Sequence, residues 1–128
     1  MIDHISINVS NLVAARDFYS KALAPLGYEL IAQIPNAEAP VVIGFGEKGK
    51  PDLWFAQSGP VQHAQHIALR TSSRKAVQAF HAASLAAGGT DNGAPGVRPH
   101  YHPHYYGGFV LDPDGHNVEA VCHDAYLE

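Results

Sequence analysis

Apolar and polar residues alternate at the start of the chain. From Ile5 to Val9 every second residue is apolar, whereas the residues between them and the preceding His4 are polar. This alternation predicts a strand with one face in the core and the other turned to a more polar interior. Apolar residues then recur every three or four positions from Leu12 to Leu23, which is the spacing of a helix buried on one side.

Signals for both ends of this helix are also present. Ser10 or Asn11 suits the position before its first turn, because a short polar side chain accepts a hydrogen bond from a free backbone N–H group there. Pro25 and Gly27 end the helix. The same order of strand, serine-containing turn, helix and glycine recurs from residue 65 to residue 89. The chain therefore contains an internal repeat.

The two copies of the repeat align at a constant offset without a gap. His4 in the first strand of one copy matches His66 in the first strand of the other. In the second copy Ser72 or Ser73 takes the position before the helix. The repeat therefore predicts two similar halves of the fold, each with a histidine at the same place.

Three shorter strand-like runs follow each helix. They are residues 28–34, 41–45 and 52–57 in the first half, and residues 89–95, 105–111 and 117–123 in the second. The sequence Asp112-Pro-Asp-Gly joins the last two runs as a tight hairpin, and His116 beyond it is expected to be exposed. We therefore predict one α+β domain of two βαβββ modules, residues 1–58 and 63–128, whose sheets pair with each other.

Net charge, apolar runs and the cysteine count limit the partners and the compartment expected for this protein. The net charge of the 128 residues is −4 with histidines neutral, so we expect no nucleic-acid partner and no anionic membrane partner. No apolar run of about 18 residues is present, so we expect no membrane-spanning helix. The N-terminal MIDHISINV lacks the pattern of a signal peptide. Cys122 is the only cysteine and has no disulfide partner in the chain, which favours a reducing, cytoplasmic compartment.

Three segments resemble one protein family. DHISINV near the start, QHIALRT in the middle and DPDGHNVEAV near the end look like the vicinal oxygen chelate superfamily. Glyoxalase I, type I extradiol dioxygenases, and fosfomycin- and bleomycin-resistance proteins belong to it. The resemblance covers nearly the whole chain and implies modules that form an open, curved, β-barrel-like sheet with a metal cleft. By position, it also implies that His4, His66 and Glu119 bind one divalent metal ion.

The faces of the predicted strands favour the same three residues. His4 and His66 each lie on the strand face opposite the apolar residues. Glu119 stands in an otherwise apolar strand, where a buried carboxylate is costly unless a cation compensates it. Two imidazoles and one carboxylate leave positions open for water and substrate. This set is typical of Fe(II) sites, although Mn, Ni, Zn and Co also fit.

The chain departs from two members of the family. Glyoxalase I has a second glutamate near the end of its first module, where this chain has Trp54. Extradiol dioxygenases have a tyrosine shortly before the last glutamate ligand, at a place near Phe109 here, with Tyr105 and Tyr106 slightly upstream. These departures leave both a glyoxalase-type and an extradiol-type reaction open.

Further side chains are candidates for contact with the substrate. We expect His104 and Tyr106 to face the cleft as acid–base or hydrogen-bonding groups beside Glu119, and Tyr105 to point away. The neighbouring histidines of the HYHPHYY run are interpreted as the rim of the cleft. Arg70 shares a strand face with His66, so it either orients an anionic substrate or forms a surface ion pair. The remaining substrate-binding candidates are Asn8, Trp54 and Phe109.

These residues favour a small metal-dependent enzyme that acts on a small oxygen-chelating substrate. Its chemistry is either of the lyase or isomerase type or the cleavage of a catechol-like ring. The alternative is a non-catalytic ligand-binding or drug-resistance module of the same fold. We also expect a homodimer, with each cleft built either by one chain or by both.

Overall fold

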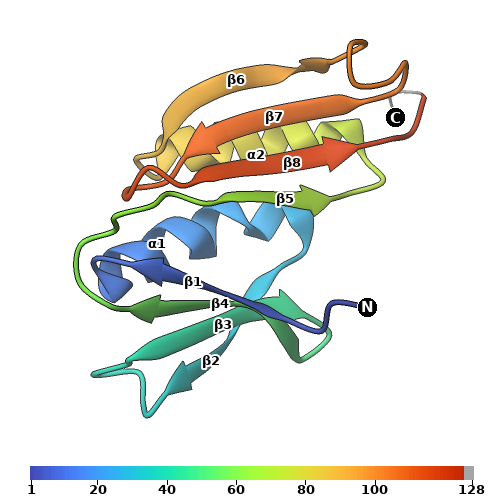
Figure 1. Cartoon of the computed structure of the whole chain (residues 1–128). Coiled ribbons are helices and arrows are strands. Elements are labelled where there is room, and N and C mark those ends of the chain that lie inside the picture. The colour runs from blue at the N-terminus through green and yellow to red at the C-terminus, as the bar shows by residue number, and fades with distance from the viewer. Residues whose placement is uncertain (126–128) are drawn as a thin grey trace.

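The computed structural model describes residues 1–125 and consists of two βαβββ modules (Figure 1). The elements of module one are β1 (Ile5–Val9), α1 (Leu12–Ala22), the 3-10 helix η1 (Ala24–Leu26), β2 (Glu29–Ile34), β3 (Val42–Glu47) and β4 (Lys50–Gln57). Those of module two are β5 (His66–Arg70), α2 (Arg74–Ala86), β6 (Thr90–Val97), β7 (Tyr106–Leu111) and β8 (Asn117–Cys122). The α+β fold of two similar modules is therefore confirmed.

Both modules have the same sheet topology. The described residues form two four-stranded sheets, with strand orders β1-β4-β3-β2 and β5-β8-β7-β6. The first strand of each module pairs in parallel with its last strand, and the other neighbours are antiparallel. Within residues 1–125 no strand pairing joins the two sheets, so the expectation that the modules pair their sheets was wrong.

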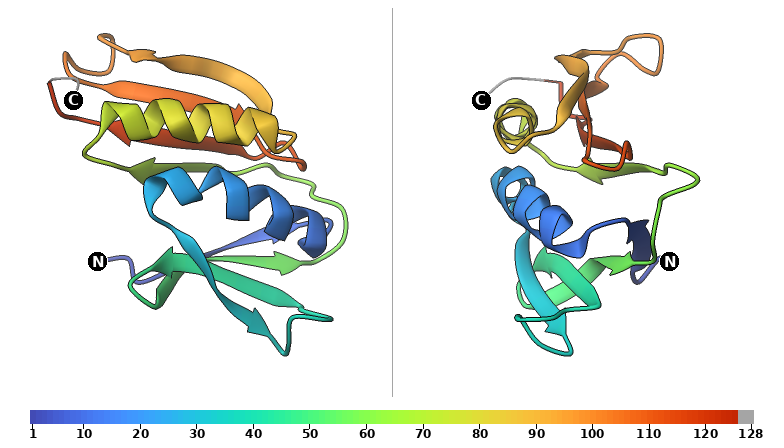
Figure 2. Two further views of the ribbon diagram at one scale, coloured as in Figure 1. Left: turned by 180° about the vertical axis from the view of Figure 1, so that it is seen from behind. Right: turned by 90° about the vertical axis from the view of Figure 1, so that its left-hand side faces the viewer.

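The two helices lie on the same side of the sheets and pack against each other (Figure 2). The cap predictions are confirmed at Asn11 and Ser73, whose side chains each accept a hydrogen bond of 3.0 Å from a backbone N–H group. The apolar side chains of the helices and of the facing strand residues are buried together. No helix of the described residues covers the opposite face of either sheet, and none is long and apolar enough to cross a membrane.

Contacts from the β7–β8 hairpin hold module two against module one. The hydroxyl of Tyr19 on α1 donates a buried hydrogen bond of 2.6 Å to Oδ2 of Asp112. Ser10 donates from both its backbone N–H and its hydroxyl to the carboxylate of Asp114. No ladder of strand hydrogen bonds joins the sheets, so these polar contacts and the packing of α2 on α1 and η1 hold the modules together.

His116 belongs to the same junction, and the expectation that it is exposed was wrong. Its relative exposure is 1%. Its Nδ1 accepts a hydrogen bond of 2.8 Å from the backbone N–H of Gln65, so its Nε2–H donates to the carbonyl of Asn8 at 2.8 Å. A hairpin residue is exposed only when nothing packs on the hairpin. Here the end of β1 lies against it.

Replacing Tyr19 with phenylalanine tests the junction. Burial, and then the charge of Asp112, raise the pKa of the Tyr19 hydroxyl well above 10.0. The native state therefore keeps this proton above pH 10, whereas the unfolded chain loses it. The Tyr19 contribution to wild-type stability should fall by about 1.4 kcal/mol per pH unit there. Below pH 10 the variant should be less stable than wild type by about 1–3 kcal/mol, because Asp112 loses a buried donor.

Denaturant unfolding of both proteins between neutral pH and pH 11 measures this difference. The gap in unfolding free energy between wild type and Tyr19→Phe should be constant up to about pH 10 and narrow above it. Other tyrosines titrate in both proteins and cancel in the comparison. A gap that stays constant to pH 11 would contradict the buried Tyr19–Asp112 hydrogen bond.

Candidate functional site

A single buried carboxylate lies in the middle of the second sheet. Glu119 is on β8, between Ala68 of β5 and Phe109 of β7, and its relative exposure is 1%. Its side chain is on the sheet face that no helix of the described residues covers. Burying a carboxylate without partners costs several kcal/mol, so the groups that contact it decide whether this strand can form.

Both oxygens of Glu119 have a partner. The Nε2–H of His66 donates to Oε1 at 2.9 Å, and the hydroxyl of Tyr105 donates to Oε2. His66 is the first residue of β5 and Tyr105 immediately precedes β7, so the two donors reach Glu119 from opposite sides of β8. The side chain of His66 is 53% exposed whereas that of Glu119 is 1% exposed. The pair is therefore reached from solvent past the imidazole.

A glycine makes room for this arrangement. A Cβ atom at Gly107 would lie 3.1 Å from Cε1 of Tyr105 and 3.2 Å from Oε2 of Glu119. Both distances are shorter than ordinary van der Waals contact. The absence of a side chain at Gly107 therefore lets the Tyr105 ring lie against Gly107 and its hydroxyl reach the carboxylate.

The Tyr105 hydroxyl is a hydrogen-bond donor across the neutral pH range. Burial, followed by its hydrogen bond to Glu119, raises the pKa of this hydroxyl well above 10.0. The charge of Arg98 opposes the shift. Because the phenol keeps its proton, it holds Oε2 of Glu119 in one orientation and leaves Oε1 facing His66.

The two tyrosines occupy the opposite positions from those expected. Tyr105 reaches Glu119, whereas Tyr106 is buried in the core and its hydroxyl accepts a hydrogen bond of 2.8 Å from Gln78 of α2. The reason is the register of β7. Val110 is in the core, and Tyr106 lies an even number of residues before it and so faces the helix. The sequence signal for Tyr105 was its odd spacing from Val110, which places the two side chains on opposite faces of the strand.

His104 is also placed differently from the expectation. It is exposed in the loop before β7, and its backbone N–H, rather than its ring, bonds to Nδ1 of His102. His102 in turn bonds to His123 at 2.7 Å between ring nitrogens, and the His102 and His123 rings pack around Tyr105. The histidine-rich loop therefore surrounds Tyr105 instead of supplying His104 to Glu119.

The three residues expected to bind metal do not all meet within one chain. His66 and Glu119 are in contact, but His4 is exposed and its ring bonds to Asp3 at 2.7 Å. Residues 1–125 contain no group of three or more histidine, cysteine, aspartate or glutamate side chains that could hold a metal ion. One chain thus brings together two of the three.

The expected substrate-binding residues fall on two surfaces. Phe109 is beside the pair, with its ring 6.3 Å from that of His66. Arg70 is exposed on β5, on the His66 side of the strand. Trp54 and Asn8 lie on the sheet of module one instead, where the Trp54 ring covers Gly44 and the Asn8 side chain is exposed.

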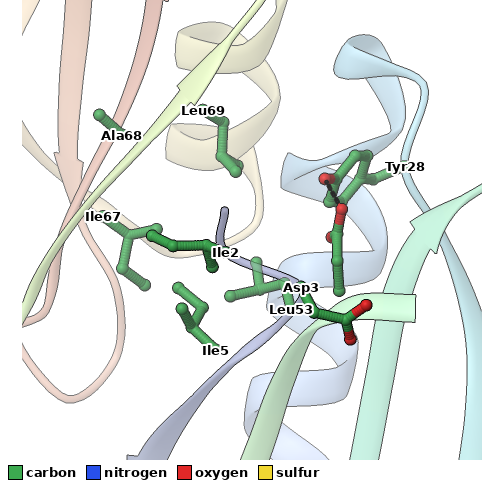
Figure 3. Close-up of a pocket in the computed structure, with 9 residues that line it drawn as sticks. Ile2, Asp3, Ile5, Tyr28, Leu53, Ile67, Ala68 and Leu69 are labelled. Carbon is green, nitrogen blue, oxygen red and sulfur yellow. Dashed lines mark hydrogen bonds between the residues drawn. The ribbon is translucent and has the colours of Figure 1, made fainter. Parts of the chain in front are cut away.

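Besides a cavity of about 360 Å³ bordered by Asn8, Pro60 and His63, two cavities lie near these elements. The first, of about 200 Å³, separates β1 from β5 and is bordered by Ile5, Ile67 and Leu69, with the Tyr28–Asp52 hydrogen bond at one side (Figure 3). Neither His66 nor Glu119 borders it. The second, of about 310 Å³, is bordered by Phe109 and Asn117, the neighbours of Glu119 and His66 in the strand register, and by Arg98 and Tyr101.

The fold and the buried pair define a class: paired βαβββ modules with a histidine and a glutamate on the open face of one sheet. The protein-family model of the Glyoxalase/Bleomycin resistance protein/Dioxygenase superfamily matches residues 1–120 of the chain. The chain belongs to this superfamily. Among curated proteins none matches the chain.

Solved structures share the fold along their whole length. A glyoxalase/bleomycin resistance protein from Albidiferax ferrireducens is 24% identical with a TM-score of 0.71, covering 95% of this chain and 98% of its own. TioX from Micromonospora sp. is 15% identical with a TM-score of 0.73, covering 97% and 99%. A glyoxalase/bleomycin resistance protein/dioxygenase family enzyme from Burkholderia phytofirmans is 19% identical with a TM-score of 0.70, covering 96% and 98%.

Removing the Tyr105 hydroxyl tests the support of Glu119. Tyr105→Phe should lower the free energy of unfolding by about 1–3 kcal/mol, because Oε2 of a buried carboxylate then has no donor. Tyr101→Phe is the matched control, since Tyr101 is exposed. Loss of its hydroxyl should change the free energy of unfolding by less than about 0.5 kcal/mol. Chemical denaturation at neutral pH measures both. Equal effects of the two substitutions would mean that Tyr105 does not support the carboxylate.

Proposed function

We propose that this protein is a divalent-metal-dependent enzyme that acts on a small substrate through two neighbouring substrate oxygens. The observation that carries the proposal is the contact between His66 and the buried Glu119, with Tyr105 on the second oxygen. A histidine and a glutamate facing each other on an open sheet face are a common pair of ligands for such ions.

The distance between the two ligand atoms fits a metal ion. Ligands about 2.1 Å from a metal and at right angles to each other are about 3.0 Å apart. The separation of His66 Nε2 and Glu119 Oε1 is 2.9 Å. Because Tyr105 occupies Oε2, Glu119 would bind through Oε1 alone, and open positions would remain for the substrate.

The third ligand in this proposal is His4 of the partner subunit in a homodimer. His4 is exposed, and its ring bonds to Asp3 of its own chain. Strand β1, which begins just after His4, is the edge strand of a sheet whose uncovered face carries the exposed Asn8 side chain and the Trp54 ring. Two such faces meeting around a two-fold axis would give two equivalent sites, each from module one of one chain and module two of the other.

Bound between these residues, the ion would supply Lewis-acid stabilisation of a negatively charged substrate oxygen. The residues of the chain have separate tasks. Glu119 and His66 hold the ion, Tyr105 fixes the orientation of Glu119, and the Phe109 ring forms a wall beside His66. Lyase, isomerase and ring-cleaving reactions all begin from such a bound, oxygen-chelating substrate.

The second candidate is a non-catalytic binding or resistance module. The observation that favours it is that one chain, over residues 1–125, brings together only two of the three expected ligands. Such a module would bind its ligand on the open sheet faces without a metal ion. Metal content therefore separates the two candidates.

Elemental analysis of purified protein after exposure to Fe(II), Mn, Ni, Zn and Co in turn tests the first candidate. Wild type should retain about one equivalent of at least one of these ions per chain. Glu119→Gln should retain none, because the amide keeps the shape of the side chain but removes the charge that binds the ion. Light scattering of the same samples should give twice the 13.7 kDa mass of one chain.

Glu47→Gln is the control for this experiment, since it makes the same chemical change at the exposed last residue of β3. It should bind metal as wild type does. Equal metal in wild type and Glu119→Gln would remove Glu119 from the site. Wild type without any of the five ions would favour the binding module.

A further inference from the structure

Arg98 is held beside the Glu119 site by its own loop. The backbone N–H of Arg98 donates to the carbonyl of Tyr105 at 2.7 Å, which closes the loop between β6 and β7. Arg98 is thereby tied to the residue that bonds Glu119.

The guanidinium group of Arg98 lies across β6 over an aromatic ring. Its Cζ is 5.5 Å from the centre of the Phe109 ring, and one of its terminal nitrogens donates to the carbonyl of Ala94 at 2.7 Å. A Cβ atom at Gly93 would be 3.3 Å from one terminal nitrogen, and a Cβ at Gly96 would be 3.1 Å from the other. The two glycines therefore leave the space that the guanidinium occupies.

The Arg98 charge has no acidic partner. No aspartate or glutamate of residues 1–125 forms an ion pair with it. It borders the 310 Å³ cavity together with Asn92, His100, Tyr101 and Phe109, and no carboxylate group borders that cavity. A guanidinium with free N–H groups, an aromatic ring beneath it and no counter-ion is suited to bind an anion.

The cavity adjoins the proposed metal ligands. Phe109 is paired with Glu119 in the β7–β8 register, and Asn117, which also borders the cavity, is paired with His66 in the β5–β8 register. A molecule that reached the His66–Glu119 pair would therefore extend over Phe109 toward Arg98.

We propose that the substrate is a small organic carboxylate with a flat apolar body, whose carboxylate is bound by Arg98 and whose body lies against Phe109. This assignment of the substrate class rests on the proposed function. It also moves the anion-binding role expected of Arg70 to Arg98, because Arg98 borders the cavity and Arg70 does not. One planar guanidinium matches one planar carboxylate, whereas a phosphate dianion would call for further positive charge.

Benzoate is the probe for this site, and benzamide is its neutral counterpart of the same shape. An NMR titration of metal-free wild type with benzoate should shift the amide signals of Gly93, Gly96 and Phe109. Arg98→Gln should weaken benzoate binding by roughly tenfold or more, and Arg98→Lys should restore part of it. Arg16→Gln, the same change on α1, should bind benzoate as wild type does. Benzamide and inorganic phosphate should bind wild type at least roughly tenfold more weakly than benzoate.

The experiment separates this proposal from the proposed function. Arg98→Gln should keep the wild-type metal content, and Glu119→Gln should keep benzoate binding. If Glu119→Gln binds as much metal as wild type, the effect of Arg98→Gln on benzoate binding still stands. Absence of benzoate binding to wild type, equal binding to wild type and Arg98→Gln, or a loss in Arg70→Gln alone would each overturn the assignment. So would phosphate binding as tight as benzoate binding.

Discussion

The site depends on one constraint: a carboxylate buried in the central part of a sheet must have a partner for each oxygen. Glu119 meets this constraint with two donors, His66 from β5 and Tyr105 from the residue just before β7. The Tyr105 contact in turn requires Gly107 to have no side chain. Because Tyr105 engages one oxygen and leaves the other facing His66, the same contacts that permit burial also leave one oxygen oriented toward an imidazole, as a metal site requires.

The relation between the modules follows from contacts other than strand pairing. The sheets of residues 1–125 share no hydrogen-bonded edge, so the β7–β8 hairpin positions module two through Tyr19, Ser10 and His116. Both helices lie on one side, which leaves the opposite sheet faces uncovered by helices (Figure 2). His4 and Glu119 lie in different modules, and the proposed function unites them through a second chain.

Local sequence patterns predicted the helices and strands correctly, because each of these elements depends on residues close to it in the chain. The caps at Asn11 and Ser73 and the buried helix faces are of this kind. The predictions for Tyr106 and His116 were wrong because each depends on a distant contact: the core position of Val110 sets the register of β7, and β1 covers the hairpin. Arg98 had no sequence signal, since no spacing indicates that glycines at two positions leave space for its guanidinium.

The most direct test of a metal site shared between two chains is subunit complementation between two variants that do not bind metal. His4→Ala and Glu119→Gln should each bind no metal alone. Refolded together in equal amounts, half of the dimers are mixed, and each mixed dimer has one intact site. The mixture should therefore bind about a quarter of the wild-type metal. A mixture that stays empty, or full metal binding by His4→Ala alone, would contradict a site shared between two chains.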